Sequence, residues 1–308
     1  MNVTDHFRAT FADSFGDVVQ QKNSRLMQAA TVETGVTGTA VQIANVLPTE
    51  DEETTGQRYK KVVLKDLDTN SRWIFPQEFQ IPTGESKWDE KRLAPTVMPG
   101  GKHVTAHGNA YARRCDKVLV SGLLGTNQTG KTGGTNADIT QVVAGDFVAS
   151  GGVVASKLTA PKVIEAVRLL VKSEAWNSDV RASGVKLFGL LDADLEASLK
   201  QYANAVGGDR MFSSDYMLPP VYDENGFLKF WLGVNWISYE GLPLVPATSY
   251  KKSAIWTNDG LHFKVWADMK TSVDLRPDLS NAVQYLSQYM LGSGRDDEKK
   301  VVQINCLV

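Results

Sequence analysis

Residues 1–82 of this 308-residue chain have too little apolar periodicity to form a hydrophobic core of their own. Phe7, Phe11 and Phe15 recur every four residues, which predicts one apolar stripe on a single helix. Thr31 to Thr39 mixes Thr, Val and Gly without a helical period and is expected to be extended. This part of the chain therefore has to pack either on the remainder of its own chain or on another molecule.

A basic β-hairpin is predicted within the same part of the chain. Arg58 to Leu67 and Arg72 to Phe79 are strand-like, and Asp68-Thr69-Asn70-Ser71 between them is typical of a turn. An acidic run, Glu50 to Glu53, precedes the hairpin. Its basic side chains are Lys60, Lys61, Lys65 and Arg72. Because the strands alternate poorly between apolar and polar residues, we expect the hairpin to project rather than to pack within the chain.

The remainder of the sequence predicts an α+β mixture of helices and strands. Val104 to Leu124 is the clearest helix, and a second is expected over Thr159 to Ala175 with Pro161 in its first turn. Val185 to Leu191 is typical of a buried strand, and Asp192 is expected to cap the helix that follows it. Further strands are predicted over Phe230 to Trp236, Leu261 to Val265, Thr271 to Leu275, Ala282 to Leu291 and Val301 to Cys306.

A glycine-rich stretch from Gly125 to Thr132 matches the pattern G-x4-G-K-T of phosphate-binding loops. Such a loop needs a strand before it and a helix after it, because the helix N-terminus supplies much of the anion site. Here a predicted helix comes before the motif, and Gly133 and Gly134 after it are poor helix formers. A flexible loop from Gly125 to about Gly152 is the favoured interpretation. A nucleotide-binding protein that uses Lys131 is the alternative from another class.

The titratable residues predict no catalytic or metal site. His103 and His107 have the i,i+4 spacing of paired metal ligands, but they are expected to be exposed histidines in the first turn of a helix. Cys115 lies on the apolar face of the same helix, and Cys306 alternates with strand core residues, so both are expected to be packed and inert. Two cysteines favour a reducing compartment. We therefore expect no enzyme activity, cofactor or metal.

The charge balance excludes two further classes of protein. There are 33 Lys and Arg residues against 35 Asp and Glu residues, which gives a net charge of -2 and argues against a dominant basic surface for nucleic acid. No apolar run exceeds three residues, so no segment is expected to span a bilayer.

The order of these features resembles that of the major capsid proteins of tailed bacteriophages, which have the Hong Kong 97-type fold. Gln21 to Leu26 followed by Thr31 to Gly38 is similar to the N-terminal arm of that family, and the basic hairpin is similar to its E-loop. The helix from Val104 to Leu124 resembles the long spine helix. Gly241 to Pro246 resembles the strand that leaves the axial domain, and Asp274 to Ile304 resembles the closing strands of the peripheral domain.

This resemblance implies a division of the chain. The expected parts are an N-terminal arm at 1–48, an E-loop hairpin at 49–82, a peripheral domain with the spine helix at 83–178 and 270–308, and an axial domain at 179–269. The arm is too short to include the long scaffolding region that some relatives carry. A separate scaffolding protein is therefore expected, with a portal and a decoration protein as further partners.

The resemblance also implies a function. The chain would assemble into hexamers and pentamers of an icosahedral head that encloses double-stranded DNA without sequence-specific binding. It would reside in the virion, and in the host cytoplasm before assembly. An encapsulin-like cellular shell protein is the alternative with the same fold. The residues expected at contacts between subunits are Phe7, Phe11, Phe15, Lys60, Lys61, Lys65, Arg72 and Trp73. We further expect Glu50 to Glu53 to pair with Lys60, Lys61 or Lys65 of a neighbour.

Overall fold

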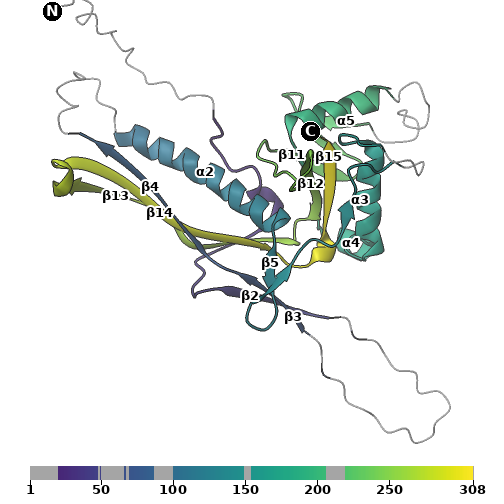
Figure 1. Cartoon of the computed structure of the whole chain (residues 1–308), viewed down its shortest axis with the longest axis horizontal. Helices are drawn as coiled ribbons and strands as arrows, with labels where there is room; N and C mark the ends of the chain where they lie inside the picture. Colours follow the sequence, from purple (N-terminus) through teal and green to yellow (C-terminus); the bar gives the residue numbers. More distant parts are fainter. Residues whose placement is uncertain are drawn as a thin grey trace, which may run out of the picture.

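The computed structural model describes residues 20–47, 49, 66, 69–86, 100–148, 154–205 and 219–307. Its longest helix, α2 (Gly100–Leu124), lies along a sheet of long strands, and a second, broader sheet lies beyond the end of that helix (Figure 1). A third, small sheet lies below the same end of α2. None of the helices in the described ranges is both long and apolar enough to cross a membrane.

The long sheet has four strands in the order β1-β13-β14-β4. Its strands are β1 (Thr31–Thr34), β13 (Leu261–Arg276), β14 (Ala282–Arg295) and β4 (Gln77–Glu85). β13 and β14 form an antiparallel hairpin closed by the short 3-10 helix η5 (Pro277–Leu279), and β4 is antiparallel to β14. β1 is parallel to β13 and pairs only with its residues His262 to Val265.

The broad sheet has seven strands in the order β7-β15-β12-β8-β11-β10-β9. Its strands are β7 (Val142–Val143), β15 (Val301–Leu307), β12 (Tyr250–Thr257), β8 (Leu187–Leu191), β11 (Val234–Ser238), β10 (Leu228–Trp231) and β9 (Val221–Tyr222). Three helices accompany it: α3 (Ala160–Lys172), α4 (Ser178–Ala182) and α5 (Ala193–Ala205). Apolar residues of α3 and α5, such as Val163 and Leu199, are fully buried in one core with β8 and β15.

The small sheet has the order β2-β3-β5-β6 and brings distant parts of the chain together. Its strands are β2 (Val41–Val46), β3 (Thr69–Ile74), β5 (Asn127–Thr129) and β6 (Thr135–Ala137). β5 and β6 form a hairpin directly after α2, and two further 3-10 helices, η2 (Met27–Ala29) and η6 (Glu298–Lys300), complete the described elements. β14 of the long sheet ends at Arg295, and η6 directly precedes β15 of the broad sheet. Asn45 of the small sheet contacts Asp296 between them, so all three sheets meet near residues 295–300.

The predicted helices and most of the predicted strands that fall within the described residues are confirmed, whereas the helix predicted from Phe7, Phe11 and Phe15 lies outside them. α2 and α3 lie where the apolar stripes place them, with Pro161 at the first turn of α3. Asp192 caps α5, since its Oδ1 accepts a hydrogen bond from the Leu195 amide at 2.8 Å. The predicted strand from Phe230 to Trp236 is instead two strands, β10 and β11. Leu232 and Gly233 between them have φ of 56° and 80°, which is the backbone of a tight two-residue hairpin turn.

One prediction about the N-terminal part is corrected. Thr69 to Ser71, expected to be a turn, belong to β3, because their backbone pairs with β2 in the small sheet. The other predicted strand of that hairpin, Arg58 to Leu67, lies outside the described residues apart from Asp66. Thr31 to Thr34 are extended as expected, and they pack within their own chain as β1.

Candidate functional site

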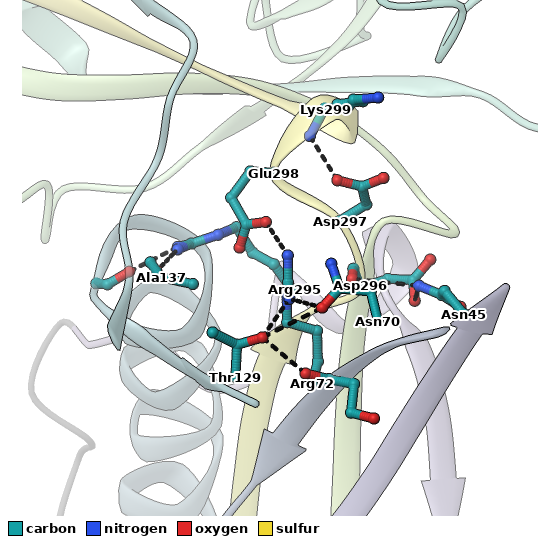
Figure 2. A network of polar contacts seen from close by, with 12 residues as sticks. Asn45, Asn70, Arg72, Thr129, Ala137, Arg295, Asp296, Asp297, Glu298 and Lys299 are labelled. Carbon is teal, nitrogen blue, oxygen red and sulfur yellow. Dashed lines mark hydrogen bonds and ion pairs between the residues drawn. The ribbon is translucent and has the colours of Figure 1, made fainter. Parts of the chain in front are cut away.

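A buried arginine at the end of β14 closes the C-terminus of α2. Arg295 is 0% exposed, and its Nη1 donates to the carbonyl oxygens of Leu123 (2.8 Å) and Gly125 (2.6 Å). Nη2 donates to the carbonyl oxygen of Ala137 in β6 at 2.8 Å (Figure 2). The last carbonyls of a helix have no partner within the helix, so this guanidinium satisfies them and ties α2 to two sheets. Burial lowers the pKa of Arg295 to about 10, which leaves it charged at neutral pH.

A second buried arginine connects the small sheet to η6. Arg72 of β3 forms an ion pair with Glu298, and both side chains are at least nine-tenths buried. The Arg72 Nη1 also donates to Asn70 Oδ1 at 2.7 Å and to Thr129 Oγ1 at 2.6 Å (Figure 2). Breaking such a pair leaves an uncompensated charge in the interior, so the contact is costly to remove even though its net contribution is small.

The residue that follows Arg295 links the small sheet to the broad one. Asp296 accepts hydrogen bonds from Asn45 Nδ2 of β2 at 2.5 Å and from Lys300 Nζ at 2.8 Å. Burial by itself would raise the pKa of Asp296, but these hydrogen bonds hold it below its ordinary value. Lys300 also pairs with Asp259 at 3.0 Å. We call the cluster of Arg72, Arg295, Asp296, Glu298 and Lys300 the joint, because it holds three sheets and the end of α2 together.

A buried carboxylate in the middle of α2 holds the beginning of the described chain. Asp116 is 0% exposed and accepts hydrogen bonds from Ser24 Oγ at 2.5 Å and from the Leu26 amide at 3.2 Å. The next residues enter the core, where the Trp256 indole donates to the carbonyl oxygen of Ala29 at 2.8 Å. The first described residues are thus fixed to α2 by polar contacts and to β12 by an aromatic one.

The two histidines near the start of α2 correct a prediction. His107 is 1% exposed rather than exposed, because α2 lies over the long sheet at this point. Its ring contacts Ser287 Oγ at 2.7 Å and Thr83 Oγ1 at 3.0 Å. His103 contacts the same Thr83 hydroxyl and stacks on Tyr285 with ring centroids 4.5 Å apart. Burial, reinforced by the neighbouring His103, lowers the pKa of His107.

The glycine-rich motif forms a hairpin rather than a phosphate-binding loop. Its residues build β5 and the tight connection to β6, with Gly130 and Gly133 at positive φ. Lys131 is exposed at the tip of this hairpin, and β6 follows it where a phosphate-binding loop requires a helix. The flexible loop predicted from Gly125 to Gly152 is likewise corrected, since β5, β6 and β7 lie within it. Cys115 is buried as predicted, and burial raises its pKa to about 12.

Most residues predicted at subunit contacts lie outside the described part of the chain. These are Phe7, Phe11, Phe15, Lys60, Lys61 and Lys65, together with the acidic run from Glu50 to Glu53. Arg72 is engaged within its own chain in the joint. Trp73 donates from Nε1 to the carbonyl oxygen of Gly130 at 2.7 Å and packs beneath the β5–β6 hairpin. The role of all these residues between subunits stays a prediction.

The residues that organise this region were not singled out by the sequence. Arg295, Asp296 and Glu298 belong to a run that is polar throughout and lies between two predicted strands. The available signal was that the run is short and lies between two strongly apolar strands, which leaves its charges little room to reach solvent. Asp116 offered a similar signal, because it follows Cys115 on the buried side of an amphipathic helix.

The contacts of this site hold separate parts of the fold together. Each charged side chain of the joint contacts a carbonyl, an amide or an opposite charge, and most of these contacts connect two different parts of the fold. A long helix along a sheet of long strands, joined at one end to a broad sheet and a small sheet, is the architecture of Hong Kong 97-type shell proteins.

Comparison with known proteins gives the family. A model of the phage capsid protein family matches residues 3–308, and the chain belongs to that family. The fold is similar to the capsid of cyanophage P-SCSP1u, at 14% identity over 99% of this chain and 94% of that chain with a TM-score of 0.64. It is similar to the capsid of Ralstonia phage GP4, at 11% identity over 98% and 95% with a TM-score of 0.64. No curated protein matches the chain.

The family and the fold also decide between the alternatives. The resemblance to phage capsid proteins is confirmed, and the capsid of the Myoviridae phage XM1 aligns with all of this chain and 99% of its own at a TM-score of 0.61 and 12% identity. A capsid protein is a structural component of the virion, which favours the phage shell over the encapsulin-like compartment and over the nucleotide-binding protein.

Proposed function

We propose that this capsid protein assembles into hexamers and pentamers of an icosahedral head that encloses double-stranded DNA. The observation that carries the proposal is the incomplete cover of the long sheet. Toward the tip of the β13–β14 hairpin, Val273, Leu275 and Leu279 are 58%, 66% and 59% exposed. Clustered large apolar side chains of this kind mark contacts between proteins. In an assembled shell, neighbouring subunits would cover them.

The division of the chain by analogy with the family supports the same proposal. We assign residues 1–48 to an arm, 49–82 to the E-loop, 83–178 and 270–308 to the peripheral domain and 179–269 to the axial domain. Leu26, Ala29 and Ile74 are buried within the chain itself. The remaining apolar residues of the arm and the E-loop would be buried on neighbouring subunits, with obligate interfaces of about 2,000 Å² or more. Contacts between the acidic run from Glu50 to Glu53 and the basic residues Lys60, Lys61 and Lys65 would set the register between subunits.

The charge balance supports a container for DNA. A net charge of -2 lets nucleic acid pack against the wall without many phosphate contacts, each of which would strengthen binding at low salt. A separate scaffolding protein, a portal and a decoration protein are the proposed partners. The proposed locations are the host cytoplasm before assembly and the virion after it.

Electron microscopy of the purified full chain tests the proposal. Closed shells, alone or with a candidate scaffolding protein from the same genome, are the expected result. A chain that remains monomeric under every condition would contradict it.

Charge reversal tests the register. Lys60→Glu combined with Lys61→Glu should reduce the yield of closed shells, because like charges would then meet at the proposed contact. Adding Glu52→Lys and Glu53→Lys should restore part of the yield, since opposite charges would face each other again. Normal shells from the first variant would rule out the proposed pairing and leave shell formation itself unaffected.

A further inference from the structure

In the part of the chain that the structure describes, the far half of β13 is an open sheet edge. On one side β13 pairs with β14 along its whole length, but on the other side β1 reaches only as far as Val265. From Lys270 to Leu275 every residue is exposed. An exposed strand of this length has unpaired backbone N–H and C=O groups, and natural proteins either blunt such an edge or pair it with another strand.

Only the first part of this edge is blunted. The pairing of β13 with β14 is irregular between Val265 and Lys270, which is the signature of β-bulges. From Lys270 to Arg276 the register is continuous, with Lys270 opposite Gln288 and Arg276 opposite Ala282. A regular seven-residue strand is therefore open for pairing at this edge.

The side chains of this strand divide between two faces. Thr271 contacts Ser287 Oγ at 2.7 Å, and Ser287 in turn contacts His107 of α2, so Thr271 and Val273 lie on the same face of the sheet as α2, although both are exposed. Lys270, Ser272 and Asp274 lie on the opposite face, because successive side chains of a strand alternate. In the part of the chain that the structure describes, Lys270 and Asp274 have no hydrogen-bonding or ionic partner.

We propose that this edge pairs with the same edge of a second copy of the chain, antiparallel and centred on Ser272. In this register Lys270 of each copy faces Asp274 of the other, so the two-fold axis creates two ion pairs. On the α2 side, Thr271 of each copy faces Val273 of the other, and pairs of β-branched residues are favourable across strands. The two long sheets become one sheet with both α2 helices on the same face.

The pattern of charges selects this register over its neighbours. Moving the centre by one residue to Val273 would place Lys270 opposite Arg276, where like charges repel. Moving it to Thr271 would leave Lys270 opposite Ser272 without a charged partner. The centred register also leaves the pair of Arg276 and Asp278 outside the paired segment, where it remains intact at 2.6 Å. The inference locates a two-fold contact within the shell and thus rests on the proposed function.

Cysteine cross-linking in assembled shells tests the contact. In Ser272→Cys the two new thiols face each other across the axis, close enough for a disulfide after mild oxidation. In the control, Asp274→Cys, the two thiols are four residues apart along the strands, about 13 Å, and cannot join. Cys115 and Cys306 are buried, so they do not compete. Dimers on a non-reducing gel from Ser272→Cys alone are the expected result. Absence of dimers, or equal dimers from both variants, would overturn the proposal.

A charge swap in the Ser272→Cys background tests the register independently. Lys270→Asp or Asp274→Lys alone places like charges opposite each other and should reduce the dimer fraction about threefold or more. The double variant restores opposite charges and should restore the dimer. A double variant no better than the singles would overturn the self-pairing and point to a different strand as the occupant.

The outcomes also separate this inference from the proposed function. If the wild-type chain forms shells and Ser272→Cys shells contain no dimer, the edge contact fails and the function stands. If no condition yields shells, the function fails. The concentrated unassembled chain then decides the edge, because selective dimers of Ser272→Cys would support it and their absence would overturn it.

Discussion

The broad sheet and the far half of the long sheet differ in what covers their strands. In β15 of the broad sheet, Val301, Val302 and Ile304 are fully buried. Val301 belongs to the core beneath α2, and Val302 and Ile304 belong to the core with α3 and α5, so both faces of β15 are covered. In the far half of β13, Val273 and Leu275 are more than half exposed, and none of the described strands pairs with the outer edge. The contacts that do hold this half against α2 are mostly polar and aromatic, made by His103 and His107.

This difference indicates that the broad sheet mainly stabilises the folded chain, whereas the far half of the long sheet is available for contacts in assembly. The broad sheet buries its apolar surface within one chain, so it can supply most of the hydrophobic free energy of folding. The far half of the long sheet leaves apolar surface and backbone groups open, which a shell subunit can use for contacts with its neighbours. Four predictions test the contrast, and they follow from the largest expected effect to the smallest.

The joint between the two regions should be the most sensitive position. Glu298→Gln removes the charge that answers Arg72 in the interior and should lower the free energy of unfolding by about 3–5 kcal/mol. The matched control is Glu165→Gln, which breaks the more exposed pair with Arg168 on α3 and should cost less than about 1 kcal/mol. Urea unfolding of the unassembled chain measures both. Equal losses would show that the joint is no more important than a surface pair.

The same substitution in the two sheets tests the contrast directly. Leu190→Ala in β8 removes a fully buried side chain and should cost about 2–5 kcal/mol. Leu275→Ala in the far half of β13 removes a side chain that is 66% exposed and should change the stability of the unassembled chain by less than about 0.5 kcal/mol. Thermal unfolding at low protein concentration provides the measurement. A large loss from Leu275→Ala would mean that this half is already covered within the chain.

The attachment of the N-terminal segment to α2 should have an intermediate effect. Asp116→Asn removes the charge that accepts hydrogen bonds from Ser24 and Leu26, and should cost about 1.5–3 kcal/mol. Limited proteolysis should then cut near Arg25 sooner than in the wild type. Asp179→Asn in the exposed helix α4 serves as the control. Unchanged cleavage in Asp116→Asn would show that the apolar contacts of Leu26 and Ala29 hold the segment alone.

The smallest expected effect is a pH dependence at the α2–sheet contact. The folded-state pKa of His107 lies below the ordinary value of 6.5, so the unfolded chain binds the proton more readily. Stability should therefore be complete above about pH 6.5 and decrease as the pH falls below it. His107→Gln should flatten this part of the curve of Tm against pH. A variant whose Tm still falls as steeply as that of the wild type would assign the effect to another group, such as His262.

Local patterns in the sequence correctly predicted the elements whose stability depends on near neighbours. The apolar stripes of α2 and α3 have the helical period, and Asp192 caps α5 by a contact three residues along the chain. The α+β class and the family follow from the order of these elements. The predicted turn was wrong at Thr69 to Ser71, because the backbone of these residues pairs with β2, and no local pattern reports such a partner.

The sequence by itself determined the helices, the apolar strands of the broad sheet and the balance of charge. Only the tertiary structure decided where the charges of the polar run after β14 lie. Arg295 caps a helix that ends 171 residues earlier at Leu124, and Glu298 forms an ion pair with Arg72 of the small sheet. The same is true of the burial of His107 and of the open edge of β13. The physical reason is that periodicity records which face of an element avoids water, whereas a buried charge or an unpaired strand depends on which other element lies beside it.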